Sequence, residues 1–341
     1  MISLKDIKVT FKGFQLGPLH LEIPESVFFI LMGPTGSGKT LLLETIAGLV
    51  RQDSGTIEIN GEDVTENPPG RRSVGIVYQD TALFPHLSVK QNIMFGVRYS
   101  QNGIKHDFDK LVEILDLERL LDRLPEKLSG GEKQRTALAR VLITDPGVIL
   151  LDEPLSSLDQ MFKGEIRSEL RRLHSETAMT FLMTTHDFTD ALSMGTHGAV
   201  IRDGRIEQAG TIDEIFYSPK TPFMASFVGM KNVFPAEFSE DGASVKGHLV
   251  RHTTNKSGHG FLAIPPESIV VSKEATVTSE RNHFIGKISS VERTGSIFSI
   301  SVACGNLLLI SSVTRSALSE LNLTKGQDVY ISFKASAVHV F

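Results

Sequence analysis

The residues whose types and spacing most clearly suggest chemistry form a glycine-rich stretch, GPTGSGKT, at positions 33–40. It fits the pattern of a glycine, four open positions and then Gly-Lys-Thr, which is typical of a loop that binds phosphate groups. Its glycines let backbone N–H groups turn inward around phosphate oxygens, and a helix that opens behind them adds its positive N-terminal end. The alternative is an ordinary glycine-rich turn between a strand and a helix. The predicted phosphate-binding residues are Gly33, Pro34, Thr35, Gly36, Ser37, Gly38, Lys39 and Thr40.

Two side chains of this loop and two carboxylates farther along the chain complete a candidate site. Lys39 can reach the terminal phosphates of a nucleotide, and the Thr40 hydroxyl can ligate Mg²⁺. The stretch VILLDEP, residues 148–154, predicts a buried strand whose acidic residues emerge at its end. Asp152 is placed to orient the water shell of Mg²⁺, and Glu153 to act as general base toward the attacking water. An acidic strand end before proline is common by itself, so its functional reading depends on the loop upstream.

The stretch LSGGEKQR, residues 128–135, predicts the start of a helix that can also bind an anion. Ser129 and Glu132 have the spacing of a capping box, in which each side chain bonds the other residue's backbone N–H. The glycines between them leave N–H groups exposed in the first turn. Taken alone, the stretch is equally compatible with a plain capped helix.

In this order, the three motifs resemble those of the ATP-binding cassette (ABC) ATPases, whose signature is similar to LSGGQ. Glu132 stands where glutamine is commonest in that family. Gln79, in VYQD, matches the family's glutamine loop, which contacts Mg²⁺ and the attacking water. His186, in TTHD, matches its switch histidine, and SSLD at 156–159 matches its D-loop.

The resemblance also places an aromatic residue against the adenine ring of ATP. Phe11 lies where the family has this aromatic, and Phe14 is close enough along the chain to compete for the role. A third reading is that either ring is simply part of the core.

The resemblance implies a homodimer in which ATP binds between two copies arranged head to tail. ATP and Mg²⁺ on the phosphate loop of one copy would then meet Ser129 and the Gly131 N–H of the other. It further implies a P-loop core similar to RecA with a helical subdomain, and membrane-spanning permease subunits as partners. A substrate-binding protein would take part indirectly.

The elements that must position these residues alternate between strand and helix over the first two thirds of the chain. Almost continuous apolar runs predict buried strands, and three-and-four spacing of leucines predicts helices. One such amphipathic helix is expected over residues 107–124. This alternation indicates an α/β fold with a largely parallel sheet. The stretches concerned are 26–32, 41–50, 75–79, 136–143, 148–152 and 180–185.

After about residue 230 the pattern changes to short alternating runs separated by turn residues. Residues 286–312 predict β-hairpins that turn at Thr-Gly-Ser and Cys-Gly-Asn, and GHLV, GFLAI and SIVV predict further strands. We therefore expect an ATPase domain over residues 1–232. A small all-β barrel domain, similar to an OB-fold, is expected over residues 233–341.

The second domain resembles the transport-associated, molbindin-like barrels of molybdate and tungstate importers. Basic, hydroxyl and amide donors in its matching segments suit a tetrahedral dianion, which would regulate the ATPase. Glu280 departs from the family pattern and adds a negative charge. Similar tails serve importers of sulfate, sugars, polyamines and iron, and these residues can also be plain turn residues. The matching positions are Ser279, Arg281, Asn282, Lys334, Ala335 and Ser336.

Composition limits the other classes of function. The chain has 341 residues, a net charge of −5 and one cysteine, Cys304. That charge disfavours nucleic acid as a partner, and the single cysteine excludes an internal disulfide framework. No apolar run approaches the roughly 20 residues of a membrane span. Together with this absence, the resemblance to importer ATPases implies a peripheral location on the cytoplasmic face of the membrane. Two alternatives stay open: a non-transport ABC ATPase, and an oxyanion sensor that would need neither Lys39 nor Glu153.

Overall fold

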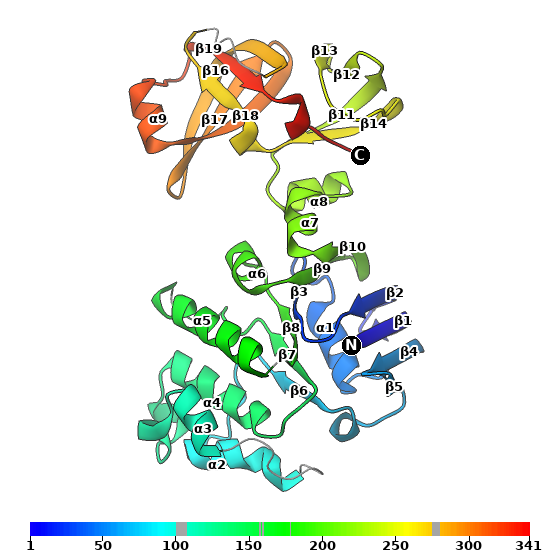
Figure 1. Cartoon of the computed structure of the whole chain (residues 1–341), viewed down its shortest axis with the longest axis vertical. Helices are drawn as coiled ribbons and strands as arrows, with labels where there is room; N and C mark the ends of the chain where they lie inside the picture. Colours follow the sequence, from blue (N-terminus) through cyan, green and yellow to red (C-terminus); the bar gives the residue numbers. More distant parts are fainter. Residues whose placement is uncertain (100–107, 157, 159, 178, 275–279) are drawn as a thin grey trace. The chain divides into compact units, whose positions relative to one another are not determined.

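A computed structural model describes residues 1–99, 108–156, 158, 160–177, 179–274 and 280–341. The described chain divides into two compact units, Met1–Ile215 and Phe216–Phe341 (Figure 1). Within the described residues, no helix combines the length and the apolar composition that crossing a bilayer requires.

The first unit consists of two sheets and the helices around them. Its strands are β1 (Ile2–Phe11), β2 (Phe14–Ile23), β3 (Phe28–Met32), β4 (Ser54–Ile59), β5 (Glu62–Asp63), β6 (Val74–Val77), β7 (Val148–Asp152), β8 (Thr180–Thr184), β9 (His197–Arg202) and β10 (Arg205–Thr211). Its helices are α1 (Lys39–Ala47), α2 (Val89–Phe95), α3 (Phe108–Ile114), α4 (Gly130–Leu142), α5 (Gln160–Thr177) and α6 (Phe188–Met194), and α7 (Ile212–Tyr217) crosses the division between the units.

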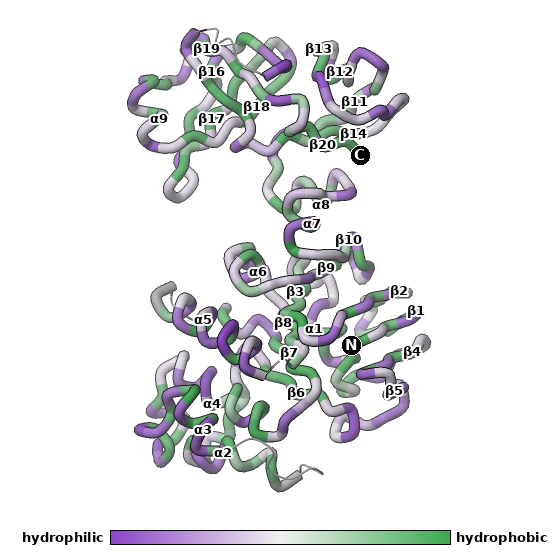
Figure 2. Tube along the Cα trace, viewed as in Figure 1, coloured by the Kyte–Doolittle hydropathy of each residue, from purple (hydrophilic) through white to green (hydrophobic). Residues whose placement is uncertain are grey.

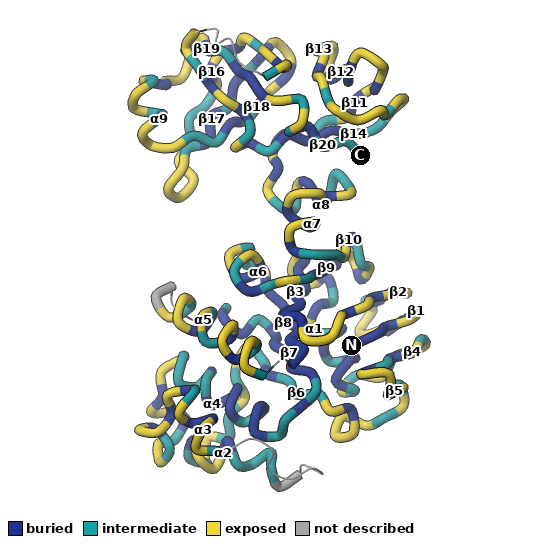
Figure 3. The backbone as a smooth tube through the Cα atoms, in the orientation of Figure 1, coloured by how far each residue is buried: buried dark blue, intermediate teal, exposed yellow. Residues whose placement is uncertain are grey.

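The larger sheet of this unit confirms the expected α/β core. Its strand order is β10-β9-β3-β8-β7-β6, and all neighbours pair in parallel except β9 with β10. Every residue of β3, β7 and β8 is buried, as their continuous apolar sequences predict (Figure 2 and Figure 3). The register pairs Thr184 with both Leu31 and Asp152, so these three strands end at one level. Loops that leave the carboxyl ends of the three strands are thereby brought together.

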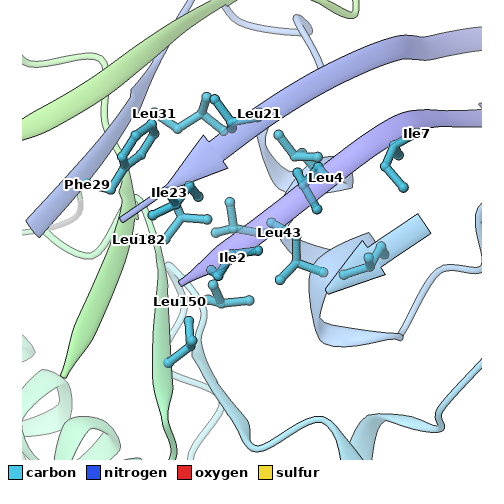
Figure 4. Packing of buried hydrophobic residues seen from close by; sticks show 14 of the residues in the cluster. Ile2, Leu4, Ile7, Leu21, Ile23, Phe29, Leu31, Leu43, Leu150 and Leu182 are labelled. Carbon is cyan, nitrogen blue, oxygen red and sulfur yellow. The ribbon is translucent and has the colours of Figure 1, made fainter. Parts of the chain in front are cut away.

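The smaller sheet, of order β2-β1-β4-β5, is antiparallel and packs its apolar face against the larger one. The core between them is built from apolar side chains of both sheets and of helix α1 (Figure 4). Because α1 is anchored in this core, the loop that precedes it has a rigid base. The core residues labelled in Figure 4 are Ile2, Leu4, Ile7, Leu21, Ile23, Phe29, Leu31, Leu43, Leu150 and Leu182.

The expectation of one continuous helix over residues 107–124 is wrong. Residue 107 lies outside the described residues; α3 ends at Ile114, and a separate 3₁₀ turn covers Glu118–Leu120. Asp116 between them has a left-handed φ of 48°. This bend lets Leu115 and Leu117 both be fully buried, which a straight helix would not allow for residues two apart.

The second unit contains two five-stranded antiparallel sheets that share one apolar core. Their orders are β13-β12-β11-β14-β20 and β15-β19-β16-β17-β18. The expected hairpins and strands are confirmed, but the unit is not entirely β because α9 follows β18. The elements are α8 (Pro222–Phe227), β11 (Asn232–Ser239), β12 (Gly242–Val245), β13 (His248–Val250), β14 (Gly258–Ile264), β15 (Val270–Ser272), β16 (Asn282–Thr294), β17 (Ile297–Cys304), β18 (Leu307–Thr314), α9 (Arg315–Glu320), β19 (Asp328–Phe333) and β20 (His339–Val340).

The two units divide earlier than the domain boundary expected after residue 232. Ala225 of α8 and Met230 pack against Ala263 of β14, so the segment after Ile215 belongs with the second unit by its contacts. A boundary between folding domains at residue 232 stays a prediction.

Candidate functional site

The phosphate loop connects β3 to α1 and takes a backbone shape that only glycine permits at two positions. Gly33 has φ 154°, and a Cβ there would lie 2.2 Å from the carbonyl oxygen of Ile201. Gly38, directly before α1, has φ 103°. The loop is therefore pressed against β9 at its start and turns sharply into the helix at its end.

Lys39 lies beneath this loop with its charge directed at the site. Its Nζ donates to the carbonyl oxygens of Gly33 at 2.9 Å and Pro34 at 3.2 Å, and it lies 4.0 Å from Oε1 of Glu153. Burial lowers the pKa of the Lys39 ammonium, and the carboxylates of Glu153 and Asp152 partly offset this effect. A buried ammonium whose hydrogen-bond partners are neutral carbonyl oxygens is suited to exchange them for charged phosphate oxygens.

The chemistry of the side chains present fits a phosphate group with Mg²⁺. The Ser37 hydroxyl is buried and has no hydrogen-bond partner among the described residues. Thr40 Oγ1 lies 2.9 Å and 3.2 Å from the two oxygens of Asp152, and the Thr184 hydroxyl donates to Asp152 Oδ1 at 2.7 Å. A hydroxyl and a carboxylate are the hard oxygen ligands that Mg²⁺ takes beside phosphates, and Ser37 supplies a donor without an acceptor.

Glu153 and His186 face each other at the ends of β7 and β8. His186 Nδ1 lies 3.0 Å from Glu153 Oε2. Glu153 has a left-handed φ of 45°, and its backbone N–H donates to the Thr184 hydroxyl at 2.9 Å. The Ser156 hydroxyl donates to the Glu153 carbonyl at 2.8 Å. These bonds fix the backbone of Glu153, and its carboxylate, with a histidine at hydrogen-bond distance, has the geometry of a general base with an orienting partner.

Gln79 lines an open cavity of about 470 Å³ that reaches Asp152. Asp152, at the end of β7, and Gly130, in the first turn of α4, line the same cavity. Tyr78 and Lys133 also line it, although neither was expected to be a site residue from its sequence motif. Lys133 lies inside the LSGGEKQR motif, and its positive charge beside a predicted anion site is the signal that could have identified it as a lining residue.

Ser129 begins α4 as the capping box predicts. Its Oγ accepts the Glu132 N–H at 3.3 Å, and its own N–H donates to the Glu132 carboxylate at 2.7 Å, which lowers the pKa of that carboxyl. Ser129 itself is exposed at this helix start. A Cβ at Gly131 would meet no atom within 4 Å. The first turn of α4 is therefore open to an approaching anion.

The two phenylalanines proposed for adenine differ in their surroundings. The Phe11 ring is 44% exposed, with Lys12 Nζ 5.2 Å from its centroid. Phe14 is half-buried against the core, and a Cβ on Gly38 would lie 3.0 Å from its ring. An exposed ring can stack on a base, whereas Phe14 supports the loop.

We therefore predict that Phe11→Ala weakens ATP binding about tenfold, the value of one aromatic–base stack, with no change in melting temperature. Phe14→Ala is the matched control: it should lower the melting temperature because it opens space beneath the phosphate loop. Titration with a fluorescent ATP analogue and thermal unfolding measure the two effects. Equal losses of ATP affinity in both variants would contradict the assignment of Phe11.

Comparisons with known proteins find related sequences along the whole chain. A family model for ABC transporters matches residues 16–156, and a TOBE domain model matches residues 278–340. The chain is 36% identical to a molybdate/tungstate import ATP-binding protein from Pyrococcus abyssi, and the alignment covers 100% of both chains. It is 35% identical to a sulfate/thiosulfate import ATP-binding protein from Synechocystis sp., over 99% of this chain and 94% of that protein.

A solved structure gives the same answer for the fold. A dimeric ATP-binding cassette in a post-hydrolysis state, bound to ADP and phosphate, aligns with a TM-score of 0.56 and 28% identity. The alignment covers 62% of this chain and 99% of that cassette. With a cassette fold, a phosphate loop facing a carboxylate and a histidine, and relatives aligned from end to end, the chain belongs to the ATP-binding subunits of ABC importers, enzymes that couple ATP hydrolysis to transport.

Proposed function

We propose that this chain hydrolyses ATP at the interface of a homodimer and drives import of a tetrahedral oxyanion of the molybdate or tungstate type. Lys39 would bind the terminal phosphates, Thr40, Asp152 and Gln79 would hold Mg²⁺, and Gln79 would also reach the attacking water. Mg²⁺, when bound, neutralises charge on the phosphates. Glu153 accepts the proton of the attacking water, and His186, 3.0 Å away, orients that carboxylate. Ser129 and the Gly131 N–H of a second copy close the site from the other side.

The dimer is part of this proposal because Ser129 is exposed, an added Cβ at Gly131 would meet no atom within 4 Å, and the similar cassette of known structure is dimeric. An isolated monomer that hydrolysed ATP at the full rate would contradict it.

We assign permease docking, at the cytoplasmic face of the membrane, to the segment after Gln79. Leu83, Phe84 and Leu87 are each half-buried. Asn92 fixes their backbone, since its side chain bonds the carbonyl oxygens of Phe84 and Leu87 at 3.1 Å and 2.9 Å. Partly exposed apolar side chains on a rigid backbone suit a helix of another chain. A substrate-binding protein would act only through that permease.

The substrate class is carried by one observation, a polar cavity in the second unit. Its volume is about 590 Å³, and it is lined by Glu240, Asp241, Arg251, His252, Thr253, Arg281, Lys334, Ala335 and Ser336. Arg281, Lys334 and Ser336 are thus close together, as their match to oxyanion-binding segments predicts. Two arginines and a lysine outnumber the two carboxylates, and Arg and Lys donors favour a dianion.

Two other residues of the matching segments have different places. Asn282 is buried beside the cavity, where its Oδ1 accepts the Arg251 N–H at 2.7 Å and its Nδ2 donates to the Arg251 carbonyl at 3.0 Å. Asn282 therefore fixes the backbone of a lining residue and does not itself line the cavity. Ser279 lies outside the described residues.

We predict that the full chain binds molybdate and tungstate in this cavity, and that bound oxyanion lowers the ATPase rate of the assembled transporter. Arg281→Ala should weaken binding at least tenfold by removing a charge-assisted donor. Arg293→Ala, which removes the same charge from an exposed hairpin, is the control.

Calorimetry with molybdate, tungstate, sulfate and phosphate measures the binding of each oxyanion. The ATPase rate is measured with and without oxyanion, and Lys39→Ala gives the background rate of that assay. Equal oxyanion affinity in the wild type and Arg281→Ala would remove the cavity from the proposal.

Sulfate is the second candidate substrate, because a similar chain is a sulfate/thiosulfate import protein. Tighter binding of sulfate than of molybdate in the same titrations would favour it.

A further inference from the structure

The orientation of the His186 ring is not fixed by contacts of the ring itself. Its side chain is 63% exposed. Glu153 Oε2 lies 3.0 Å from Nδ1 and holds one edge of the ring. Packing therefore contributes little to the orientation of the ring, which must be set mainly by the backbone that carries it.

That backbone is fixed by the neighbouring Thr185. The Thr185 hydroxyl donates to Asp190 Oδ2 at 2.8 Å and accepts the Asp187 N–H at 3.0 Å. The Thr185 N–H donates to the carbonyl oxygen of Leu31 in β3 at 3.3 Å. The residues immediately before and after His186 are thus joined through a single buried hydroxyl, whose acceptor is Asp190.

Asp190 in turn depends on an arginine of another helix. Its side chain is only 3% exposed, and a carboxylate so deeply buried requires a charged partner. Arg167 of α5, 14% exposed, lies 2.6 Å from Asp190 Oδ1 and 3.4 Å from Asp187 Oδ2. One guanidinium therefore holds the two carboxylates that follow His186 in the sequence. Lys163, also on α5, lines the small cavity beside Asp187 and Asp190 and adds a second positive charge.

We propose that Arg167 is a positioning residue for ATP hydrolysis: through Asp190, Asp187 and the Thr185 hydroxyl it sets where His186 meets Glu153. The inference rests on the proposed role of His186. It concerns the rate of the chemical step and not the binding of ATP, because the hydrogen bonds and ion pairs of Arg167 among the described residues go to Asp187 and Asp190 and not to the phosphate loop.

The experiment compares Arg167→Gln, Arg167→Lys and Arg171→Gln in the wild-type chain and in His186→Ala. Arg171→Gln is the matched control, since it removes the same charge from α5 where Arg171 bonds Ser168 and Ser193.

In the wild-type background we expect Arg167→Gln to lower kcat about tenfold, the effect of a small misplacement of a catalytic group. KM for ATP should change less than twofold. Arg167→Lys should give an intermediate kcat, because lysine neutralises one carboxylate but lacks the fork that reaches both. Arg171→Gln should match the wild type.

The double variants decide between positioning and general destabilisation. If Arg167 acts through His186, Arg167→Gln lowers kcat no further once His186 is alanine. An equal loss in both backgrounds, or a loss that appears in KM, would overturn the proposal. Should Arg167→Gln fail to fold, Arg167→Lys carries the same comparison, because it keeps Asp190 paired. Full activity in His186→Ala alone would show that the role assigned to His186 is wrong, whereas additive losses would reject only the link to Arg167.

Discussion

Replacing Glu153 by glutamine is expected to lower ATP turnover about 10³-fold while ATP binding is kept. Glutamine has the size of glutamate but cannot accept the proton of the attacking water, and removal of a general base costs about 10²–10⁴ in rate. Lys39, Thr40 and Asp152 are untouched by this change, so the contacts to phosphate and Mg²⁺ remain. Because hydrolysis is blocked after binding, the variant should also accumulate as an ATP-bound dimer.

Single-turnover hydrolysis, a binding titration and light scattering with and without ATP measure these three effects. Glu165→Gln, which changes an exposed carboxylate on α5, is the control and should retain wild-type turnover. Turnover within tenfold of the wild type in Glu153→Gln would show that another group accepts the proton. Gln79 cannot do so as an amide, so His186 would become the candidate.

Replacing Arg72 by methionine is expected to lower the stability of the first unit by about 4 kcal/mol. The Arg72 side chain is almost completely buried and donates to four backbone carbonyl oxygens, those of Thr45, Ile46, Thr65 and Asn67. Two of these carbonyls belong to the last turn of α1, where a positive charge also complements the helix dipole. Methionine fills similar space but removes the donor from the carbonyls of Ile46 and Asn67. The Thr65 and Thr45 carbonyls would keep only the Gln52 side chain and the Gly48 N–H, respectively.

Thermal or urea unfolding of the full chain measures this loss in the transition that belongs to the first unit. A loss of about 4 kcal/mol corresponds to a fall of roughly 10 °C in the melting temperature of that unit. Arg71→Met removes the same charge from the adjacent, exposed position and should change the melting temperature by less than about 2 °C. A similar small effect for Arg72→Met would mean that water or neighbouring groups satisfy the four carbonyls.

Much of the site can be predicted because its parts are short and contiguous in sequence. The phosphate loop needs glycines at fixed offsets before a helix, and the Ser129–Glu132 cap joins residues three apart, so the sequence by itself determines both. The buried strands β3, β7 and β8 follow equally directly from their unbroken apolar runs. Their parallel pairing then explains why Lys39, Asp152 and His186, far apart in sequence, meet at one edge of the sheet.

What the sequence alone could not determine depends on contacts between distant segments. The helix expected over 107–124 ends near Asp116, because the left-handed turn there lets Leu115 and Leu117 both be buried, which a continuous helix would not. Only the tertiary structure shows that Arg72 bonds the last carbonyls of α1 and that Asn282 bonds the backbone of Arg251. The same holds for the ion pairs of Arg167 with the two carboxylates after His186. Each of these side chains satisfies buried polar groups of another segment. A periodicity or a motif cannot report such a partner, since the need for it arises only when the chain has folded and water has been excluded.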